Sequence, residues 1–395
     1  MNPNLILPIL ILTSSVAIMS TDIYAPSLAH LPEYFGTDPA TVKLTMSMNA
    51  MVYALATLVY GPLSERFGRR PVLLWGMVGF TLFSFLCGTA ATIGDLIAMR
   101  ILQGLTAAVE GAVVLAIIRD VFDNRDQIRA LAWYGAATAL TPAAAPILGG
   151  YIYIWSGWRM TFYVVALVAF ATTILIWKYL PESTTKDPHA LRLRSVVADY
   201  AGLLRNWTYL RYVLIGAADV AFFFAFVTAG PFILIRQHGL PTEYFGYVQG
   251  LFVLSFVFGN VLAAKLSPHM SGERLVLLGI VASLCGTALL ALVVFGGMET
   301  PTTIAAASAL IAFGDGPVFA TTPSLAMNAS SSRTGAAAAL LMAIEVGMGS
   351  LSALAVGVFH DGTSRPFAWT VVALGVLMVL CYLPGRTRRA GRESA

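Results

Sequence analysis

The sequence predicts an all-α polytopic membrane protein, and three observations support this fold class. Of the 395 residues, 58% are hydrophobic and only 11% are charged, and the mean hydropathy is +0.78. A soluble domain would carry about 25% charged residues. Apolar runs of about 20 residues recur from end to end, and each is long enough to cross a bilayer core of about 30 Å as a helix. Helices are expected because lipid offers the backbone no hydrogen-bond partners.

Twelve apolar runs are predicted to span the membrane. They cover residues 5–28, 41–60, 71–90, 96–118, 128–153, 160–179, 209–235, 245–266, 275–295, 302–327, 335–359 and 367–383. Most of the 24 Lys and Arg residues fall on one side of this layout. Cytoplasmic loops are enriched in Lys and Arg, so both termini are predicted to be cytoplasmic.

The longest polar stretch divides the predicted spans into two sets of six. The expected organisation is an N-terminal six-helix bundle at 1–180, a cytoplasmic linker at 181–207, a C-terminal six-helix bundle at 208–384 and a basic cytoplasmic tail at 385–395.

A short charged segment, residues 61–74, joins the second and third runs. Gly61 and Gly68 are expected to allow a tight reversal, and Pro71 suits the first turn of the next helix. The charged residues of the segment are Glu65, Arg66, Arg69 and Arg70. Positive charge alone would fit a loop that only fixes topology, but the spacing of glycine, acid and arginine is more specific than that.

Six charged residues fall well inside predicted spans, away from the span ends. A charge at mid-bilayer costs at least about 2.5–3.5 kcal/mol on insertion scales, so each is a functional candidate. The alternative for each acid is a neutral carboxyl that is hydrogen-bonded to a neighbouring carbonyl. The six residues are Asp22, Arg100, Glu110, Asp219, Asp315 and Glu345.

The fourth run carries polar residues on one helix face. Arg100, Gln103, Ala107, Glu110 and Val114 are spaced by three and four, so they share a face that should avoid lipid. Either this face looks into a water-filled cavity, or Arg100 simply pairs with Asp22 and joins two helices. Glu110 has no basic partner within the spans once Arg100 is used.

The fifth run contains Pro142, Pro146, Gly149 and Gly150. Two prolines four residues apart should bend a helix, and a glycine pair lets a neighbour approach closely. Proline and glycine are also common in membrane helices without a special role.

Five motifs together resemble the major facilitator superfamily. They are Thr21-Asp-Ile-Tyr-Ala-Pro26, the segment Gly61 to Arg70, Arg100-x-x-Gln-Gly104, Arg119-Asp120, and Pro142 to Gly150. The set is most similar to twelve-span drug:proton antiporters of the Bcr/CflA group of bacterial multidrug exporters. Two positions depart from the family pattern, because Glu65 replaces an Asp and Ala145 replaces a Gly.

The resemblance implies a major facilitator fold and assigns roles to three groups of residues. By the resemblance, Asp22 and Arg100 are the expected coupling residues, whereas Glu110 belongs to none of the motifs and is a candidate because of its depth, its helix face and its lack of a basic partner. The whole set expected at the proton-coupling site and substrate cavity is Asp22, Tyr24, Arg100, Gln103, Glu110, Asp219, Asp315 and Glu345. The expected cytoplasmic gate contains Gly61, Glu65, Arg66, Gly68, Arg69, Arg70 and Arg119. The expected antiporter hinge contains Pro142, Pro146, Gly149 and Gly150.

The function that the resemblance implies is proton-coupled export of small amphipathic drugs or metabolites, cationic or neutral, across a bacterial inner membrane. The expected partners are the substrate, protons and lipid, with no nucleic acid, no cofactor and no metal, and the protein is expected to be monomeric. One alternative is a facilitator or proton symporter for a sugar, amino acid or siderophore on the same fold. The other is a membrane enzyme or receptor, which the sequence disfavours because it has no nucleotide loop and no His/Cys metal cluster.

Overall fold

The structure is a computed structural model that describes residues 3–122, 124–184, 193–330 and 334–393. Within these ranges the chain forms helices and no strands. Twelve of the described segments are long and apolar enough to cross a membrane, and each overlaps one predicted run. The predicted fold class is therefore confirmed. The chain divides into two compact units, residues 1–193 with 241–250 and residues 194–240 with 251–395.

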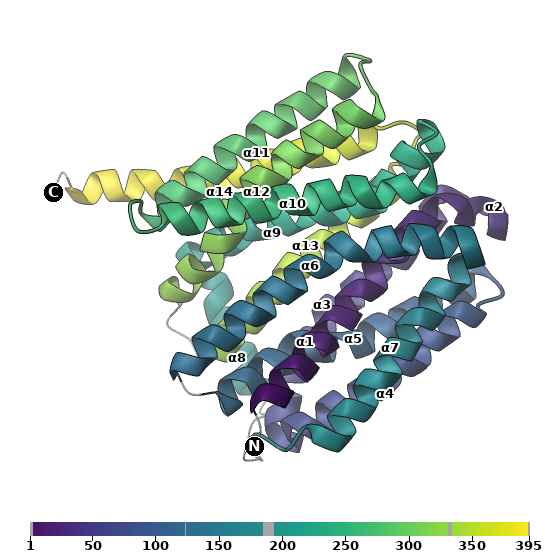
Figure 1. Cartoon of the computed structure of the whole chain (residues 1–395). Coiled ribbons are helices and arrows are strands. Elements are labelled where there is room, and N and C mark those ends of the chain that lie inside the picture. The colour runs from purple at the N-terminus through teal and green to yellow at the C-terminus, as the bar shows by residue number, and fades with distance from the viewer. Residues whose placement is uncertain (1–2, 123, 185–192, 331–333, 394–395) are drawn as a thin grey trace. The chain divides into compact units, whose positions relative to one another are not determined.

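The first unit is built from long helices that pack in a connected series (Figure 1). Helix α5 packs against α3 and α4, α4 packs against α7, and α1 packs against α6. The start of α10 also belongs to this unit. The elements are α1 (Pro3–Asp22), η1 (Ala25–His30), α2 (Leu31–Phe35), α3 (Pro39–Phe67), α4 (Arg69–Thr89), α5 (Ile93–Val121), α6 (Asn124–Ser156) and α7 (Trp158–Tyr179).

The first predicted span is broken rather than continuous. Helix α1 ends at Asp22, and after two turn residues the chain continues as the 3-10 helix η1 with Pro26 in its first turn. Proline has no backbone N–H and is accepted at the start of a helical segment but not in the middle of one. The break leaves Asp22 at the end of α1, directly before the two turn residues.

The reversal between α3 and α4 occurs at Gly68 alone. Gly61 was expected to help the turn, but it lies inside α3, which continues to Phe67. Gly68 has φ +104°, a conformation that favours glycine, and α4 starts at the next residue. A single glycine costs a helix only about 1 kcal/mol relative to alanine, so Gly61 alone does not end α3.

Side chains fix the starts of two helices of this unit. The Asp38 carboxylate accepts hydrogen bonds from the backbone N–H and the hydroxyl of Thr41 at the start of α3. These bonds favour the ionised form and lower the pKa of Asp38. At the start of α5, Thr92 and Asp95 each bond the other's backbone N–H, which forms a capping box.

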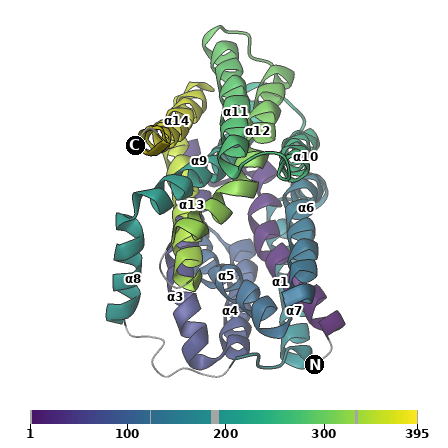
Figure 2. The ribbon, with the colours of Figure 1, turned by 90° about the vertical axis from the view of Figure 1, so that its left-hand side faces the viewer.

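The second unit contains the remaining helices (Figures 1 and 2). Helix α11 lies beside α12, and α9 packs against α12, α13 and α14. The elements are α8 (Leu193–Arg205), α9 (Trp207–Gly230), the π-helix η2 (Pro231–Gln237), α10 (Thr242–Leu266), α11 (Gly272–Phe295), α12 (Pro301–Ala329), α13 (Thr334–Val358) and α14 (Arg365–Glu393).

The polar segments predicted around the second unit are partly helical. The predicted linker contains α8, while its residues 185–192 lie outside the described residues. Helix α14 continues from the last candidate span into the predicted tail as far as Glu393, and the basic side chains of the tail are not among those described.

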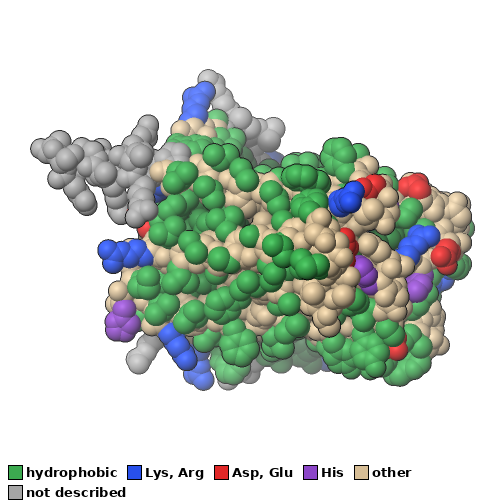
Figure 3. All heavy atoms as spheres, turned by 90° about the horizontal axis from the view of Figure 1, so that it is seen from above, with side chains coloured by type: hydrophobic (Ala, Val, Ile, Leu, Met, Phe, Trp, Pro, Cys, Tyr) green, Lys and Arg blue, Asp and Glu red, His purple; other side chains and the backbone are tan. Residues whose placement is uncertain are grey.

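The surface suits a lipid environment. Figure 3 shows a face that is covered mainly by hydrophobic side chains, with charged side chains gathered toward its two ends. Large apolar side chains such as Trp75, Trp177 and Phe258 are more than half exposed. Lipid, not water, is the solvent that makes such exposure favourable.

Candidate functional site

Glu110 lies in the core of the first unit, where side chains from several helices meet it. The carboxyl is 5% exposed and accepts a hydrogen bond of 2.8 Å from the Tyr53 hydroxyl of α3. The Ser14 hydroxyl of α1 also interacts with the carboxyl. Tyr134 of α6 donates a hydrogen bond of 3.0 Å to Ser14. Helices α1, α3 and α6 therefore all contribute hydroxyl groups around one carboxyl of α5.

No Lys, Arg or His in the described part of the chain forms an ion pair with Glu110. A buried carboxylate without a countercharge is strongly disfavoured unless a proton or a cation joins it. A hydroxyl group can hydrogen-bond the carboxyl whether the carboxyl is protonated or ionised, because a hydroxyl both donates and accepts. Chemically, this arrangement can exchange a proton for a cationic group.

Asp22 is the second buried carboxyl of the first unit. It is 2% exposed and accepts a hydrogen bond of 3.0 Å from Nε2 of Gln249. Gln249 is fully buried and comes from the start of α10, which belongs to the same unit. The side chain of Asp22 is thus held by a neutral amide, which leaves its charge uncompensated.

Arg100 does not pair with Asp22. Within the described residues its guanidinium bonds neutral groups, namely the carbonyl oxygens of Thr45 and Ser20 at 3.3 Å and Oε1 of Gln103 at 2.6 Å. It is completely buried and lies over the ring of Tyr24, with 5.4 Å from Cζ to the ring centroid. The expected alternative of an Asp22–Arg100 ion pair is therefore wrong, because backbone carbonyls and aromatic faces satisfy the arginine instead.

The polar face predicted for the fourth run is buried as a whole. Arg100, Gln103, Ala107, Glu110 and Val114 are each at most 6% exposed. Gly104 lies beside this face and allows the close approach of α3, because an added Cβ would meet the backbone carbonyl of Asn49. The face is therefore directed at partner helices of the first unit and not at lipid.

In the motif predicted to form a cytoplasmic gate, Arg69 is the centre of a charge cluster. It pairs with Asp120 of α5 at 3.2 Å and, more weakly, with exposed Glu65 at 3.9 Å, and it donates a hydrogen bond of 2.6 Å to Ser64. Its backbone N–H donates to Glu182 at 2.8 Å. The cluster joins the ends of α3, α4 and α5 to the chain that follows α7.

The other basic residues of the motif lie around this cluster. Arg70 donates a hydrogen bond of 2.7 Å to the carbonyl of Trp177, and exposed Arg66 lies over the ring of Phe67. Arg119 was expected in the cluster, but it is exposed, and in the described residues Asp120 occupies that place instead. Successive residues of a helix point in different directions, so Arg119 and Asp120 cannot both face Arg69.

The proline and glycine element of α6 packs tightly against neighbouring backbone. Helix α6 is continuous through Pro142 and Pro146. An added Cβ at Gly149 would meet the backbone carbonyl of Ile23, the residue after Asp22. An added Cβ at Gly150 would lie 3.1 Å from Cα of Glu243 at the start of α10. The expected close approach at the glycine pair is present, and it occurs beside Asp22.

The second unit buries the other three predicted acids. Asp219 of α9, Asp315 of α12 and Glu345 of α13 are between 1% and 7% exposed. Asp219 interacts with both of the other carboxyls. The structure thus brings these three together, whereas Asp22 and Glu110 belong to the first unit.

Several residues of these sites escaped the sequence reasoning, which weighed charge above neutral polarity. Tyr53, Ser14, Gln249 and Glu182 were not singled out. The first three are uncharged, and their one signal is polarity within an apolar run. Glu182 is charged, but it follows the sixth run in a segment that looked like ordinary linker.

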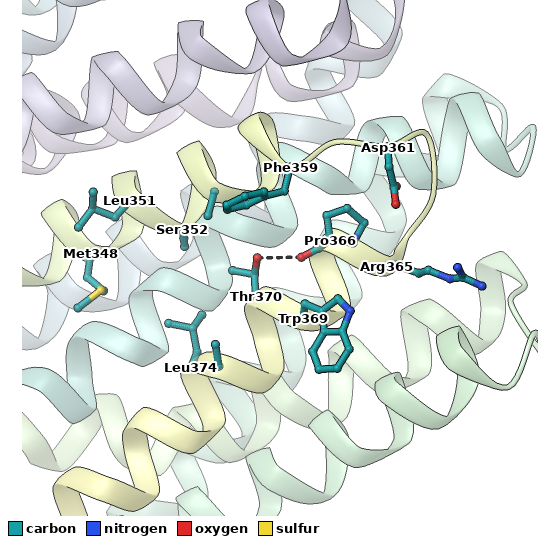
Figure 4. A pocket seen from close by; sticks show the side chains of 12 residues that line it. Met348, Leu351, Ser352, Phe359, Asp361, Arg365, Pro366, Trp369, Thr370 and Leu374 are labelled. Atoms are coloured by element: carbon teal, nitrogen blue, oxygen red, sulfur yellow. Dashed lines mark hydrogen bonds between the residues drawn. The ribbon is translucent and has the colours of Figure 1, made fainter.

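A groove on the second unit lies away from the buried acids. It has a volume of about 600 Å³ between α13 and α14, with Phe359 and Trp369 along it and Asp361 and Arg365 at one end (Figure 4). The Asp361 carboxylate accepts hydrogen bonds from Thr363, which lower its pKa. None of the predicted site residues lines this groove.

Known proteins resemble the chain over nearly its whole length. A bicyclomycin resistance protein homolog of Haemophilus influenzae is 26% identical over 370 residues, which cover 91% of each chain. Multidrug resistance protein D of Escherichia coli is 26% identical over 388 residues, which cover 98% of this chain and 97% of the relative. Among solved structures, a D-xylose-proton symporter has a TM-score of 0.74 at 14% identity and covers 96% of this chain and 97% of its own. At this identity the likeness to the symporter shows the fold alone.

The family profile of the Major Facilitator Superfamily matches residues 10–353. Members of this superfamily are transporters of small molecules, and the twelve candidate spans in the described residues agree with the bacterial relatives. The chain therefore belongs to the Major Facilitator Superfamily and is a multi-pass transporter of the bacterial inner membrane, not an enzyme.

Proposed function

We propose that the protein is a proton-coupled antiporter that exports small amphipathic compounds, cationic or neutral. One observation carries the proposal. Glu110 is buried among hydroxyl groups, and no described Lys, Arg or His pairs with it. A carboxyl in such a place binds either a proton or a positively charged group, and the two compete for the same oxygen atoms.

The exchange follows from this competition. When a substrate cation approaches, the carboxylic O–H of Glu110 releases its proton to water and the carboxylate remains with the cation. When the site opens to the outside, an incoming proton binds the carboxylate and the substrate leaves. Each ligand lowers the affinity for the other by the same factor, which is the linkage that antiport requires.

Asp22 is the second coupling group in this proposal. It lies at the break between α1 and η1, where the helix end and the turn can change conformation at lower cost than an intact helix. Arg100, with Tyr24 and Gln103, holds the surrounding helices in register through bonds to carbonyl and amide oxygens. Its role is to position Asp22 and its neighbours and not to neutralise them.

Alternating access completes the proposal. The two predicted six-helix bundles, residues 1–180 and 208–384, would move so that the substrate site is exposed to each side of the membrane in turn, as in other transporters with repeated halves. The Arg69 cluster would hold the cytoplasmic gate, and the Pro142 to Gly150 element would serve as the hinge. We further propose that both termini are cytoplasmic and that the protein works as a monomer.

The substrate class rests on the site chemistry and on the relatives. An embedded carboxylate favours cationic or neutral amphipathic compounds and disfavours anions. Two of the relatives are named for resistance to bicyclomycin and to multiple drugs. Export of antibiotics or metabolites of this kind is the corresponding proposal for this chain.

Transport in proteoliposomes tests the proposal. Purified protein is reconstituted with a pH-sensitive dye trapped inside, and ethidium or chloramphenicol is added under an imposed proton gradient. Antiport predicts drug-dependent proton movement opposite to drug flux. Proton movement in the same direction as a sugar or amino acid would support the symporter alternative instead, and drug flux without protons would identify a facilitator.

A further inference from the structure

Three carboxyls from three helices meet in the core of the second unit. They are Asp219 of α9, Asp315 of α12 and Glu345 of α13, and these helices pack against one another (Figure 1). Asp219 lies against Asp315 and also interacts with Glu345. Their exposed fractions are 4%, 1% and 7%. This grouping of like charges is unfavourable unless protons or cations separate them.

Three carboxyl oxygens of the Asp219–Asp315 pair make no hydrogen bond of ordinary length to a described residue, although the Ser283 hydroxyl is a neighbour of Asp315. This holds for Oδ2 of Asp219 and for both oxygens of Asp315, all of them buried. Buried polar atoms in native proteins nearly always have a partner, so three such atoms in one place indicate a missing one. A proton on one carboxyl supplies that partner, since its O–H can donate to the other carboxyl.

Gly216 makes room for the third carboxyl. An added Cβ at this position would lie 2.8 Å from Oε1 of Glu345 and 2.9 Å from Oγ1 of Thr322. Gly216 precedes Asp219 by three residues, so both lie on one face of α9. Any larger residue would push the Glu345 carboxyl away from this face, where it now interacts with Asp219.

No positive charge is available to this cluster from the described residues. Asp219 is faced by Asp315 and Glu345, and Asp315 is also faced by Ser283 of α11. Among the described side chains of α14 the charged one is Arg365, which is exposed at the start of that helix. The arginine of α9, Arg211, pairs with Glu273 at 3.4 Å. The described residues also contain no group of three side chains arranged to hold a metal ion. A proton is therefore the ligand that fits.

We propose that Asp219, Asp315 and Glu345 form a second proton-binding centre of the transporter, separate from Glu110 and Asp22 of the first unit. One proton binds to a carboxyl oxygen of Asp219 or Asp315, and the resulting O–H donates a hydrogen bond to the other carboxyl. Glu345 accepts the proton when the pair releases it. The inference rests on the proposed proton coupling and adds that this centre moves one proton in each cycle, besides the one proton that Glu110 and Asp22 together exchange in the first unit.

The test measures the number of protons that move with each substrate. Wild type, Asp219→Asn and Asp315→Asn are reconstituted in liposomes, and the proton gradient that stops ethidium flux is determined at several drug gradients. Ser308→Ala is the matched control, because Ser308 is a fully buried polar residue two turns earlier on α12. The proton-to-ethidium ratio is expected to fall by about half in both Asp variants and to stay at the wild-type value in the control.

An unchanged ratio in both Asp variants would overturn the second centre and leave the antiport proposal standing. Absence of proton movement in the wild type would instead overturn both, so the two failures can be distinguished. If ethidium flux depends on sodium and not on protons, the cluster binds a metal cation, and the inference is wrong.

A second measurement does not depend on transport. Infrared spectra of purified, folded protein detect the carbonyl band of protonated carboxylic acids. Part of this band is expected to disappear in Asp315→Asn but not in Ser308→Ala. In Glu345→Gln, the rest of the band should disappear at a different pH from the wild type. A band identical in wild type and all variants means that the pair holds no proton, and the inference is then wrong.

Discussion

The Tyr53 hydroxyl donates a hydrogen bond of 2.8 Å to Oε1 of Glu110 across the α3–α5 interface. This bond makes a neutral group the partner of a membrane-embedded acid. Ser14 and Tyr134 extend the same arrangement to α1 and α6. Because hydroxyl groups can rotate to serve a carboxyl with or without its proton, the site can change its protonation state without losing its hydrogen bonds.

Replacing Glu110 by Gln should reduce export of cationic drugs most. The amide keeps the size of the side chain and can still bond Tyr53, so the protein should fold, but it cannot offer a negative charge. We expect export of cations to fall about tenfold or more, which corresponds to about 1.4 kcal/mol. Resistance of cells to ethidium and to a neutral drug measures the effect. Asp126→Asn, which neutralises an exposed carboxylate at the start of α6, is the control. Equal loss for neutral and cationic drugs would contradict a cation-binding role and indicate a general coupling role.

Replacing Tyr53 by Phe should weaken substrate binding and leave turnover largely intact. The change removes the donor to Glu110, and a hydrogen bond to a charged group is worth about 1.5–3 kcal/mol. We expect KM for a cationic drug to rise about tenfold with little change in kcat. Tyr163→Phe removes a comparable hydroxyl that bonds the Gly88 carbonyl and should change neither value. Similar kinetics in the two variants would rule out a special role for the Tyr53–Glu110 bond.

Replacing Gly68 by Ala should destabilise the first unit at the turn between α3 and α4. Gly68 has φ +104°, and the Glu182 carboxylate stands where a Cβ would lie. Forcing a side chain into this backbone conformation costs about 1–3 kcal/mol. Gly61→Ala is the control within the same motif, because Gly61 is helical and an added Cβ there meets open space. Thermal unfolding in detergent should distinguish the two, and equal melting temperatures would contradict the assigned turn.

Replacing Gly149 by Ala should impair both stability and transport. The added Cβ would meet the Ile23 carbonyl and push α6 away from the chain break beside Asp22. Overpacking of this kind typically costs about 1–3 kcal/mol. Gly135→Ala on the same helix, where an added Cβ meets nothing, should behave as wild type. If both variants export drugs normally, the close contact at Gly149 does not matter for the cycle.

The sequence was sufficient for the features that depend on local pattern. Apolar run length predicts all twelve spans, and three- and four-residue spacing predicts the buried face of α5 that carries Arg100 and Glu110. Helix α4 begins at Arg69, two residues before the predicted run, and Pro71 lies in its first turn as expected.

Features that depend on long-range packing could not be predicted. Asp22 bonds Gln249, which lies 227 positions away in the chain, and no local pattern pairs them. Charge alone suggested Arg100 as the partner of Asp22, but buried carbonyls compete with carboxylates for arginine, and only the fold decides which is near. Gly61 stays helical because a single glycine lowers helix stability by only about 1 kcal/mol relative to alanine, which is a weak local signal for a turn.

The most direct test of the account is proton release on drug binding in the absence of any gradient. Purified wild-type protein in weakly buffered detergent solution is mixed with ethidium, and the pH change is recorded, with Asp22→Asn and Glu110→Gln measured in parallel. The account predicts that wild type acidifies the solution and that Glu110→Gln binds ethidium more weakly and releases fewer protons. Proton release that is unchanged in both variants would contradict the claim that these two carboxyls exchange a proton for substrate.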